Sequence, residues 1–259
     1  PYTWVMEIIS GLHNLRPRHK GCVLTIGNFD GVHRGHQRLI DHLQLQSKSL
    51  QLPTMLMTFE PQPREFFAGA MLPARLTRFR EKVHLLECTG LDRLLCLPFN
   101  EQTSQIPAEW FAEEFLTELV GARYVVIGDD FRFGHERQGD FQLLQNTGAR
   151  LGYEVISVDT VLQAGDRVSS TLVRSTLSAG NFSKAAELLG HEYFIMGRVV
   201  YGRQLGRQLG VPTANLKLQR YRAALEGVYC VTVDGVAEDG QPLQGIANIG
   251  VRPTVDGKE

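Results

Sequence analysis

A glycine-rich turn at residues 27–36, G-N-F-D-G-V-H-R-G-H, limits the folds open to this chain because it separates two segments of different periodicity. Residues 22–26 form a short apolar and β-branched run, which predicts a buried strand. After the turn, Leu39, Ile40, Leu43 and Leu50 recur at roughly helical spacing, which predicts an amphipathic helix from about Gly35. A strand, a turn and a helix in this order begin a βαβ unit.

The same alternation continues to about residue 190. We expect further strands at residues 54–59, 94–97, 124–127 and 153–158, and further helices at 107–119, 141–151, 171–179 and 183–189. The helix that begins at Pro107 would carry on one face Trp110, Phe111, Phe115 and Leu119. Helical crossovers imply a parallel sheet covered on both faces, with ligands beyond the carboxyl ends of the strands. The prediction is an α/β, Rossmann-like domain with a parallel sheet over residues 7–189.

The sequence changes character at about Gly190. Glycines punctuate the remainder, the run at residues 228–233 alternates with period two, and no long helical pattern is visible. Short strands separated by glycine turns favour a small β-barrel. We therefore predict a second domain at residues 190–259 that abuts the first without a low-complexity linker.

The overall charge and apolar content exclude several classes of protein. Lys+Arg 27 against Asp+Glu 28 gives a formal net charge of −1, which argues against a general nucleic-acid binder. No apolar run is long enough for a membrane span, and no export signal opens the chain. The four cysteines form no C-x-x-C pair, as expected of buried free thiols in a reducing compartment. These features predict a cytoplasmic protein.

The turn at residues 27–36 has the composition of a phosphate-binding site. Glycines let the backbone approach phosphate oxygens, and the free N–H groups of the following helix attract negative charge. His33 and His36 lie at the mouth of the turn, so both imidazoles can reach one polyphosphate, and Gly35 leaves room for the nucleotide. Two alternatives are surface histidines present by chance and a zinc site, although no third ligand stands at metal-site spacing.

A second candidate phosphate site is the octet R-V-S-S-T-L-V-R at residues 167–174, which enters a helix. Ser170 and Thr171 are positioned to cap that helix, which is their alternative role. Arg174 lies one turn further on the same side as Thr171, where its guanidinium could bind a phosphate. The octet is a weak signal alone and a stronger one beside H-x-G-H.

Taken together, these motifs resemble the prokaryotic bifunctional riboflavin kinase/FAD synthetase family from about Gly11 to the last residue. In the first half the resemblance is carried by residues 27–36, T-F-E-P-Q-P at 58–63, G-D-D-F-R-F-G at 128–134 and V-S-S-T-L-V-R at 168–174. In the second half it is carried by G-R-V-V-Y-G at 197–202, G-R-Q-L-G-V-P-T-A-N-L at 206–216 and G-I-A-N-I-G-V-R-P-T at 245–254. Gln62 and Val168 stand where the family often has His and Ile, and neither change removes a charge that the mechanism needs.

The resemblance implies roles for individual residues of the first half. His33, His36 and Arg174 would be catalytic groups on the ATP phosphates. The rest of the nucleotide site would consist of Gly27, Phe29, Asp30, Gly31, Gly35, Ser170 and Thr171. Glu60 and Asp130 would lie near the metal or the flavin phosphate, and solvated loop carboxylates are their alternative role. Phe131 and Phe133 would face the flavin ring unless they pack in the core.

The resemblance also implies the substrates and the reactions. The first domain would adenylylate FMN with ATP and Mg²⁺ to give FAD and pyrophosphate, and the second would phosphorylate riboflavin to FMN. Thr213 and Asn215 would hold Mg²⁺ and ATP in the kinase site. The family's catalytic glutamate follows the R-P-T segment at a distance that Glu259 does not reach. We therefore expect the kinase module to be incomplete in this polypeptide and its kinase activity to be impaired.

Two other classes of function remain open on the sequence. The first is another H-x-G-H adenylyl- or cytidylyltransferase, against which the residues at 128–134 and 212–215 favour the flavin enzyme. The second is a non-catalytic nucleotide or flavin sensor, although both phosphate-binding segments are intact. The expected partners are small molecules, with neither nucleic acid nor a membrane among them.

Overall fold

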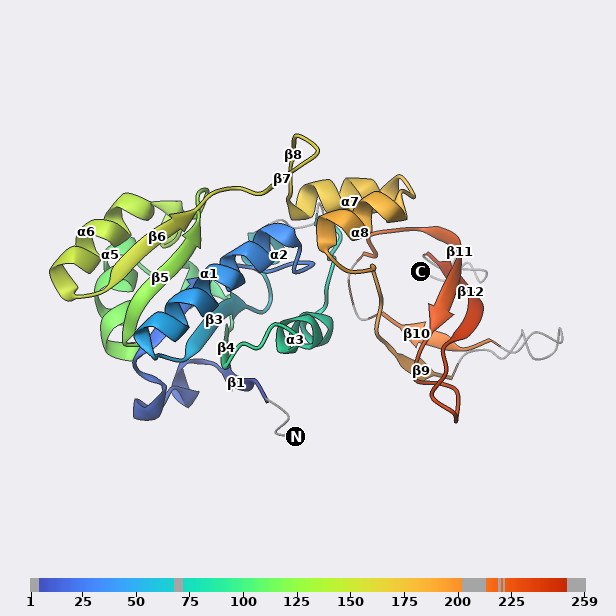
Figure 1. Cartoon of the computed structure of the whole chain (residues 1–259), viewed down its shortest axis with the longest axis horizontal. Coiled ribbons are helices and arrows are strands. Elements are labelled where there is room, and N and C mark those ends of the chain that lie inside the picture. The colour runs from blue at the N-terminus through green and yellow to red at the C-terminus, as the bar shows by residue number, and fades with distance from the viewer. Residues whose placement is uncertain (1–4, 68–71, 202–212, 219, 221, 251–259) are drawn as a thin grey trace.

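The computed structural model describes residues 5–67, 72–201, 213–218, 220 and 222–250. Its centre is a six-stranded parallel sheet with the order β1-β4-β3-β2-β5-β6 (Figure 1). The strands are β1 (Glu7–Ser10), β2 (Cys22–Ile26), β3 (Thr54–Phe59), β4 (Arg93–Leu97), β5 (Ala122–Gly128) and β6 (Glu154–Val158). The order places β2, and the turn that follows it, near the middle of the sheet. The predicted α/β class is confirmed.

Helices connect the strands and cover both faces of the sheet. They are α1 (Arg34–Leu50), α2 (Pro63–Phe67), α3 (Phe79–Glu87), α4 (Glu101–Ser104), α5 (Ala108–Trp110), η4 (Phe111–Leu119), α6 (Phe141–Leu151), α7 (Ser170–Ser178) and α8 (Phe182–Leu189). Short 3₁₀ helices are η1 (Leu12–Asn14), η2 (Pro17–His19) and η5 (His135–Arg137). Two separate apolar clusters, one containing α1 and α3 side chains and the other η4 and α6 side chains, pack against strand residues. Burial on both faces explains why the central strands are apolar throughout.

Several features of this domain differ from the sequence prediction, which did not include helices α2, α3 and α4. Strand β1 was not expected, and it pairs with β4 at the edge of the sheet. The helix predicted at 107–119 continues after Trp110 as a π-helix, in which Val120 N–H donates to the Phe115 carbonyl. Its wider turn buries Phe111, Phe115 and Val120 and leaves Leu119 37% exposed, so the prediction of Leu119 on the apolar face is wrong.

The part of the chain after α8 is rich in antiparallel strands, as predicted. Strand β9 (Arg198–Val200) pairs with β10 (Asn215–Lys217), and β11 (Gly227–Val233) pairs with β12 (Leu243–Ile249). These strands lie at the opposite end of the molecule from α6 and β6, with α7 and α8 between them (Figure 1). The segment at 193–201 reads as strand-like in the sequence, and the structure forms a strand there only at residues 198–200. One reason is that the Met196 amide donates to the Glu81 carboxylate rather than to a neighbouring strand.

Three further expectations concern cysteines, membranes and the second half of the chain. All four cysteines are free, with Cys22 and Cys96 buried and Cys88 and Cys230 exposed, so burial was predicted correctly for half of them. Within the described ranges, no helix combines the length and apolar character that crossing a bilayer needs. Some residues of the kinase-half motifs lie outside the described part of the chain: 202, 206–212 and 251–254. Glu259 lies outside it as well.

Candidate active site

The turn between β2 and α1 is held in a conformation that few sequences tolerate. Gly31 has φ +83°, and a Cβ there would lie 2.8 Å from Cδ1 of Leu76. Phe29 and Val32 also have positive φ values, 49° and 42°, although neither is a glycine. Both of these side chains are buried, and the packing stabilises a backbone that would otherwise be costly. The turn therefore delivers His33 to the N-cap position of α1 in a fixed orientation.

The two histidines of the motif form a stacked pair. The ring centroids of His33 and His36 are 3.7 Å apart, and the Phe29 ring lies 4.8 Å from that of His36. Gly35 makes this arrangement possible, because a Cβ there would lie 3.2 Å from Cε1 and Nδ1 of His33. The interpretation that Gly35 leaves room is thus supported for the imidazole of His33.

Both imidazoles are neutral at physiological pH and carry an unused nitrogen. Burial lowers the pKa of His33 to about 4, with opposing effects of Asp30 and Arg174. Burial, followed by the nearby His33 and Lys82, lowers the pKa of His36 well below its usual value of 6.5. Nδ1 of each ring is buried without a hydrogen-bond partner among the described residues. A buried polar atom of this kind fits a ligand that supplies hydrogen-bonding groups, as a polyphosphate does.

Asp30 anchors the turn to a distant segment. Its carboxylate accepts hydrogen bonds from the amides of Leu76 (3.1 Å) and Thr77 (2.9 Å) and from the Thr77 hydroxyl (3.2 Å). It also pairs with Nη2 of Arg174 at 2.5 Å, and its side chain is only 3% exposed. These protein donors engage the carboxylate, so the structure gives Asp30 a supporting position beneath the predicted nucleotide site.

Arg174 lies against the same turn, through its pair with Asp30. Its Nη2 pairs with Asp30, and its Nε donates to the carbonyl of Ala74 at 2.5 Å. Nη1 makes no hydrogen bond within the described part of the chain, and the side chain is 16% exposed. One edge of the guanidinium is thus fixed by the protein, and the other is available to an anion.

The capping prediction for α7 requires correction. Ser169 caps the helix, because its side chain accepts from the Leu172 amide. The Ser170 hydroxyl instead donates to the backbone carbonyl of Asp30 at 3.0 Å, and Thr171 is exposed. Ser170 therefore ties the start of α7 directly to the histidine turn.

A lysine that the sequence interpretation missed lies under this turn. Lys82 of α3 is fully buried, and its ammonium donates to the Asn28 carbonyl at 2.6 Å and to the Thr58 hydroxyl at 3.2 Å. Burial lowers the pKa of Lys82 to about 8, while the negative charge of Asp30 opposes that shift. A lysine in an amphipathic helix gives no signal in the sequence that distinguishes it from a solvated one.

The carboxyl ends of β3 and β4 present a carboxylate and an aromatic surface. Glu60 forms a bidentate pair with Arg75, with both oxygens 2.7 Å from its nitrogens. An aromatic cluster lies beside it, in which all ring centroids are 5.2–5.7 Å from a neighbour: Phe59, Phe66, Phe67 and Phe99. Phe66 and Phe67 are 42% and 68% exposed, so the cluster presents apolar ring surface to solvent. The sequence interpretation assigned no role to this cluster.

The loop after β5 carries the other predicted flavin-site residues. Asp130 is exposed and pairs with Arg167 at 2.6 Å. The rings of Phe131 and Phe133 are stacked with centroids 5.6 Å apart. Phe133 is buried against Phe111 in the core, so of the two rings only Phe131 is partly exposed. Core packing is the role that the structure shows for Phe133.

The predicted kinase residues lie far along the chain, beyond the parallel sheet. Asn215 is the first residue of β10 and pairs in register with Val200 of β9, and Thr213 lies just before it. Within the described ranges, no group of three or more His, Cys, Asp or Glu side chains could hold a metal ion.

Comparisons with known proteins agree with the two-part organisation. The family model for FAD synthetase matches residues 15–172, and the model for riboflavin kinase matches residues 189–259. A bifunctional riboflavin kinase/FMN adenylyltransferase from Pseudomonas fluorescens is 49% identical over 97% of this chain and 80% of its own length. The enzyme of the same description from Escherichia coli K12 is 48% identical over the same shares.

A solved structure shows the same fold over nearly the whole chain. The crystal structure described as a macrolide-efflux protein from Streptococcus pneumoniae aligns with a TM-score of 0.78 and 30% sequence identity. The alignment covers 98% of this chain and 82% of that one. The similarity therefore extends over both the parallel sheet and the strands that follow it.

Proposed function

Because this chain belongs to the family of bifunctional riboflavin kinase/FMN adenylyltransferases, enzymes of flavin cofactor biosynthesis, we propose that His33, His36 and Arg174 together bind the triphosphate of ATP during FMN adenylylation. The observation that carries this proposal is the unused hydrogen-bonding capacity at the turn. Among the described residues, Nδ1 of each imidazole has no hydrogen-bond partner. Arg174 uses Nε and Nη2 for Ala74 and Asp30, and no hydrogen bond of Nη1 is found in the same part of the chain. ATP, FMN and riboflavin fit the family as substrates.

The reaction is an in-line displacement at phosphorus. An oxygen of the FMN phosphate attacks the α-phosphorus of ATP, the new P–O bond gives FAD, and the bond to the β-phosphate breaks to release pyrophosphate. Neutral imidazoles donate hydrogen bonds to the phosphate oxygens, where negative charge increases in the transition state. Arg174 binds the departing pyrophosphate, and Lys82 adds positive charge beneath the turn. The protein's contribution is positioning and charge neutralisation, without a covalent intermediate.

Magnesium is the metal that this proposal assigns to the phosphates. Bound to ATP, it would neutralise charge on the phosphate oxygens and make the α-phosphorus more electrophilic. Glu60 is the carboxylate closest in sequence to the end of β3. Both of its oxygens accept from Arg75, which leaves it less available to bind a metal ion. Asp130 is exposed on the loop after β5 and pairs with Arg167 at 2.6 Å. We assign Asp130 and water to the outer coordination of the metal.

Two aromatic surfaces flank the histidine turn, and either can stack on the isoalloxazine ring. Phe131 follows β5 on one side, and the cluster of Phe59, Phe66, Phe67 and Phe99 follows β3 and β4 on the other. The strand order places the turn between these two surfaces. The cluster is the better flavin site, because its rings are more exposed and Glu60 lies beside it. A Phe67→Ala change should then raise the KM for FMN more than a Phe131→Ala change does.

In the second module, Thr213 and Asn215 are the proposed ligands for Mg²⁺-ATP. The 5′-hydroxyl of riboflavin would attack the γ-phosphorus, giving FMN and ADP. The assignment rests on the P-T-A-N sequence at residues 212–215 and on the match to the riboflavin kinase model. We also propose that the boundary between the adenylyltransferase domain and the kinase domain lies at about residue 190. We also place the protein in the cytoplasm, since its four free cysteines suit a reducing compartment.

The decisive assay mixes the chain with ATP, Mg²⁺ and FMN and measures pyrophosphate release and FAD formation. We expect turnover, and a reduction on the order of 10²–10³-fold in His36→Ala. His42→Ala is the matched control, because His42 lies on α1 more than one turn beyond His36 and should leave the rate unchanged. Binding of ATP and FMN without pyrophosphate release would instead indicate a sensor. Normal turnover in His36→Ala would refute the assignment of that residue.

A further inference from the structure

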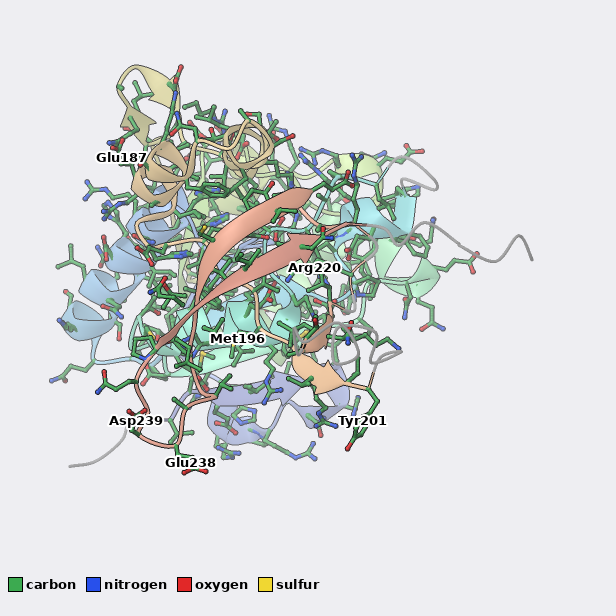
Figure 2. The ribbon with its side chains drawn as sticks, turned by 90° about the vertical axis from the view of Figure 1, so that its right-hand side faces the viewer. Glu187, Met196, Tyr201, Arg220, Glu238 and Asp239 are labelled. Atoms are coloured by element: carbon green, nitrogen blue, oxygen red, sulfur yellow. The ribbon has the colours of Figure 1, made fainter. Side chains whose placement is uncertain are left out.

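A buried ion pair joins the two parts of the chain. Glu81 of α3 and Arg220 are each 1% exposed, and Nη2 of Arg220 lies 2.7 Å from both carboxylate oxygens. Glu81 also accepts from the backbone amides of Arg78 at 2.7 Å and Met196 at 2.8 Å. Figure 2 shows Arg220 and Met196 over the centre of the face that the second module presents, with Tyr201, Glu238 and Asp239 towards its lower edge.

The same guanidinium holds a backbone segment that supports the adenylyl-transfer site. Nη1 of Arg220 donates to the carbonyls of Arg75 at 3.3 Å and Leu76 at 3.5 Å. The amides of Leu76 and Thr77 donate to Asp30 from the other side of this segment. Asp30 in turn fixes Arg174, whose Nε donates to the carbonyl of the preceding Ala74. Residues 74–77 are therefore held between Arg220 on one side and the Asp30–Arg174 pair on the other.

Apolar packing reinforces this connection. Leu76 belongs to a buried cluster that contains Val173 of α7, Leu189 of α8 and, from the second module, Ala224 and Leu225. The cluster means that the second module buries part of the segment as well as hydrogen-bonding it. A side chain from residues 220–225 thus contributes to the surroundings of a site formed by residues 30–36 and 174.

We propose that Arg220 is a positioning residue for FMN adenylylation: the second module supplies the guanidinium that fixes residues 75–77, and through them the carboxylate of Asp30 and the guanidinium of Arg174. This inference rests on the proposed role of Arg174 in binding the triphosphate. It makes the adenylyl-transfer site dependent on a residue that lies outside the region matched by the FAD synthetase model. Arg220 itself does not touch substrate.

The test is steady-state FAD formation by the full chain, with ATP and FMN varied separately. In Arg220→Met we expect the KM for ATP to rise about tenfold while the KM for FMN stays within twofold of the original value. Arg220→Lys should give an intermediate KM for ATP, because an ammonium can pair with Glu81 but lacks the fork that also reaches the two carbonyls. A purely structural role would lower the amount of active enzyme and leave both KM values unchanged.

Two further variants keep the test informative. If Arg220→Met leaves Glu81 as an unpaired buried charge and prevents folding, the double variant Glu81→Gln/Arg220→Met removes that charge and should show the same rise in the KM for ATP. Leu225→Ala is the matched control, since it weakens the same contact without removing a hydrogen bond to residues 75–77. It should lower the melting temperature and leave the KM for ATP unchanged.

The outcomes separate this inference from the proposed function. An original chain that forms no FAD would overturn both. An active chain that loses activity in His36→Ala but keeps its KM for ATP in both Arg220→Met and the double variant would overturn the positioning role alone. An equal rise in the KM for ATP in Leu225→Ala would also contradict it, because general loosening of the contact would then suffice.

Discussion

Replacing Asp30 by Asn should separate a supporting residue from a ligand of the nucleotide. The carboxylate accepts from two backbone amides, one hydroxyl and the Arg174 guanidinium. An Asn side chain retains one acceptor oxygen, but its NH₂ group would face the groups that donate to Asp30 and could not accept from them. It also leaves Arg174 without its counter-charge in a largely buried position.

The expected loss of stability follows from these contacts. Breaking a buried ion pair by removing one partner costs about 3–5 kcal/mol, against a total stability of about 5–15 kcal/mol for a typical domain. For a chain of this size, that corresponds to a decrease in melting temperature on the order of 10 °C. Arg174 should at the same time lose its orientation, and the KM for ATP should rise.

Thermal unfolding followed by circular dichroism, together with the kinetics of FAD formation, measures both effects. Asp41→Asn is the control, because Asp41 is exposed on α1, and it should change stability by less than about 0.5 kcal/mol. If Asp30→Asn melted with the original chain while ATP binding was lost, Asp30 would be a direct ligand. The anchoring argument would then be refuted.

Three further predictions concern the same turn. Because burial depresses the pKa of His33 from 6.5 to about 4, the unfolded chain takes up that proton first, so stability should be complete above about pH 6.5 and fall by up to about 3 kcal/mol as the pH approaches 4. Denaturant titrations across this range test it, and His33→Gln showing the same pH dependence would contradict it. Gly31→Ala should lower the free energy of unfolding by about 2–4 kcal/mol, because of its positive φ and the contact with Leu76. Gly165 has an equally positive φ but open space around it, so Gly165→Ala should lower the free energy of unfolding by only about 1–2 kcal/mol. Equal losses in the two variants would count against the steric argument. Lys82→Met should weaken ATP binding about tenfold in calorimetry, since one buried positive charge is removed, and an unchanged affinity would show that this charge does not act on the phosphates.

The position of the histidine turn could be predicted from the local sequence, but the contacts that hold the turn in place could not. The apolar run before it and the helical periodicity after it sufficed to place His33 and His36 where a strand gives way to a helix, and the structure has His33 at the N-cap and His36 in the first turn of α1. The contacts that orient the turn join residues about 46 apart or more, such as Asp30 with Leu76 and with Arg174. No periodicity or spacing in a single sequence encodes such pairs, because only the folded topology brings them together.

Local ambiguity explains the smaller errors. Three consecutive hydroxyl residues stand at the start of α7, each suited to capping, and Ser169 takes the N-cap position while Ser170 and Thr171 are the first residues of the helix. The apolar face at 107–119 fits an α-helix or a wider one, and the packing of Val120 favours the π-helical turn. In the sequence, Glu81 and Arg220 look like ordinary charged residues exposed to solvent. Their burial depends on how the two modules pack together.

The convergence of His33 and His36 on one triphosphate can be observed directly by NMR of the chain with ¹⁵N-labelled histidine during an ATP titration. The account predicts that ring-nitrogen signals of both residues shift together on ATP binding, as the unpartnered Nδ1 atoms gain hydrogen-bond partners, while those of His42 on α1 stay in place. Saturation with ATP that leaves the ring-nitrogen signals of residues 33 and 36 unchanged would contradict it.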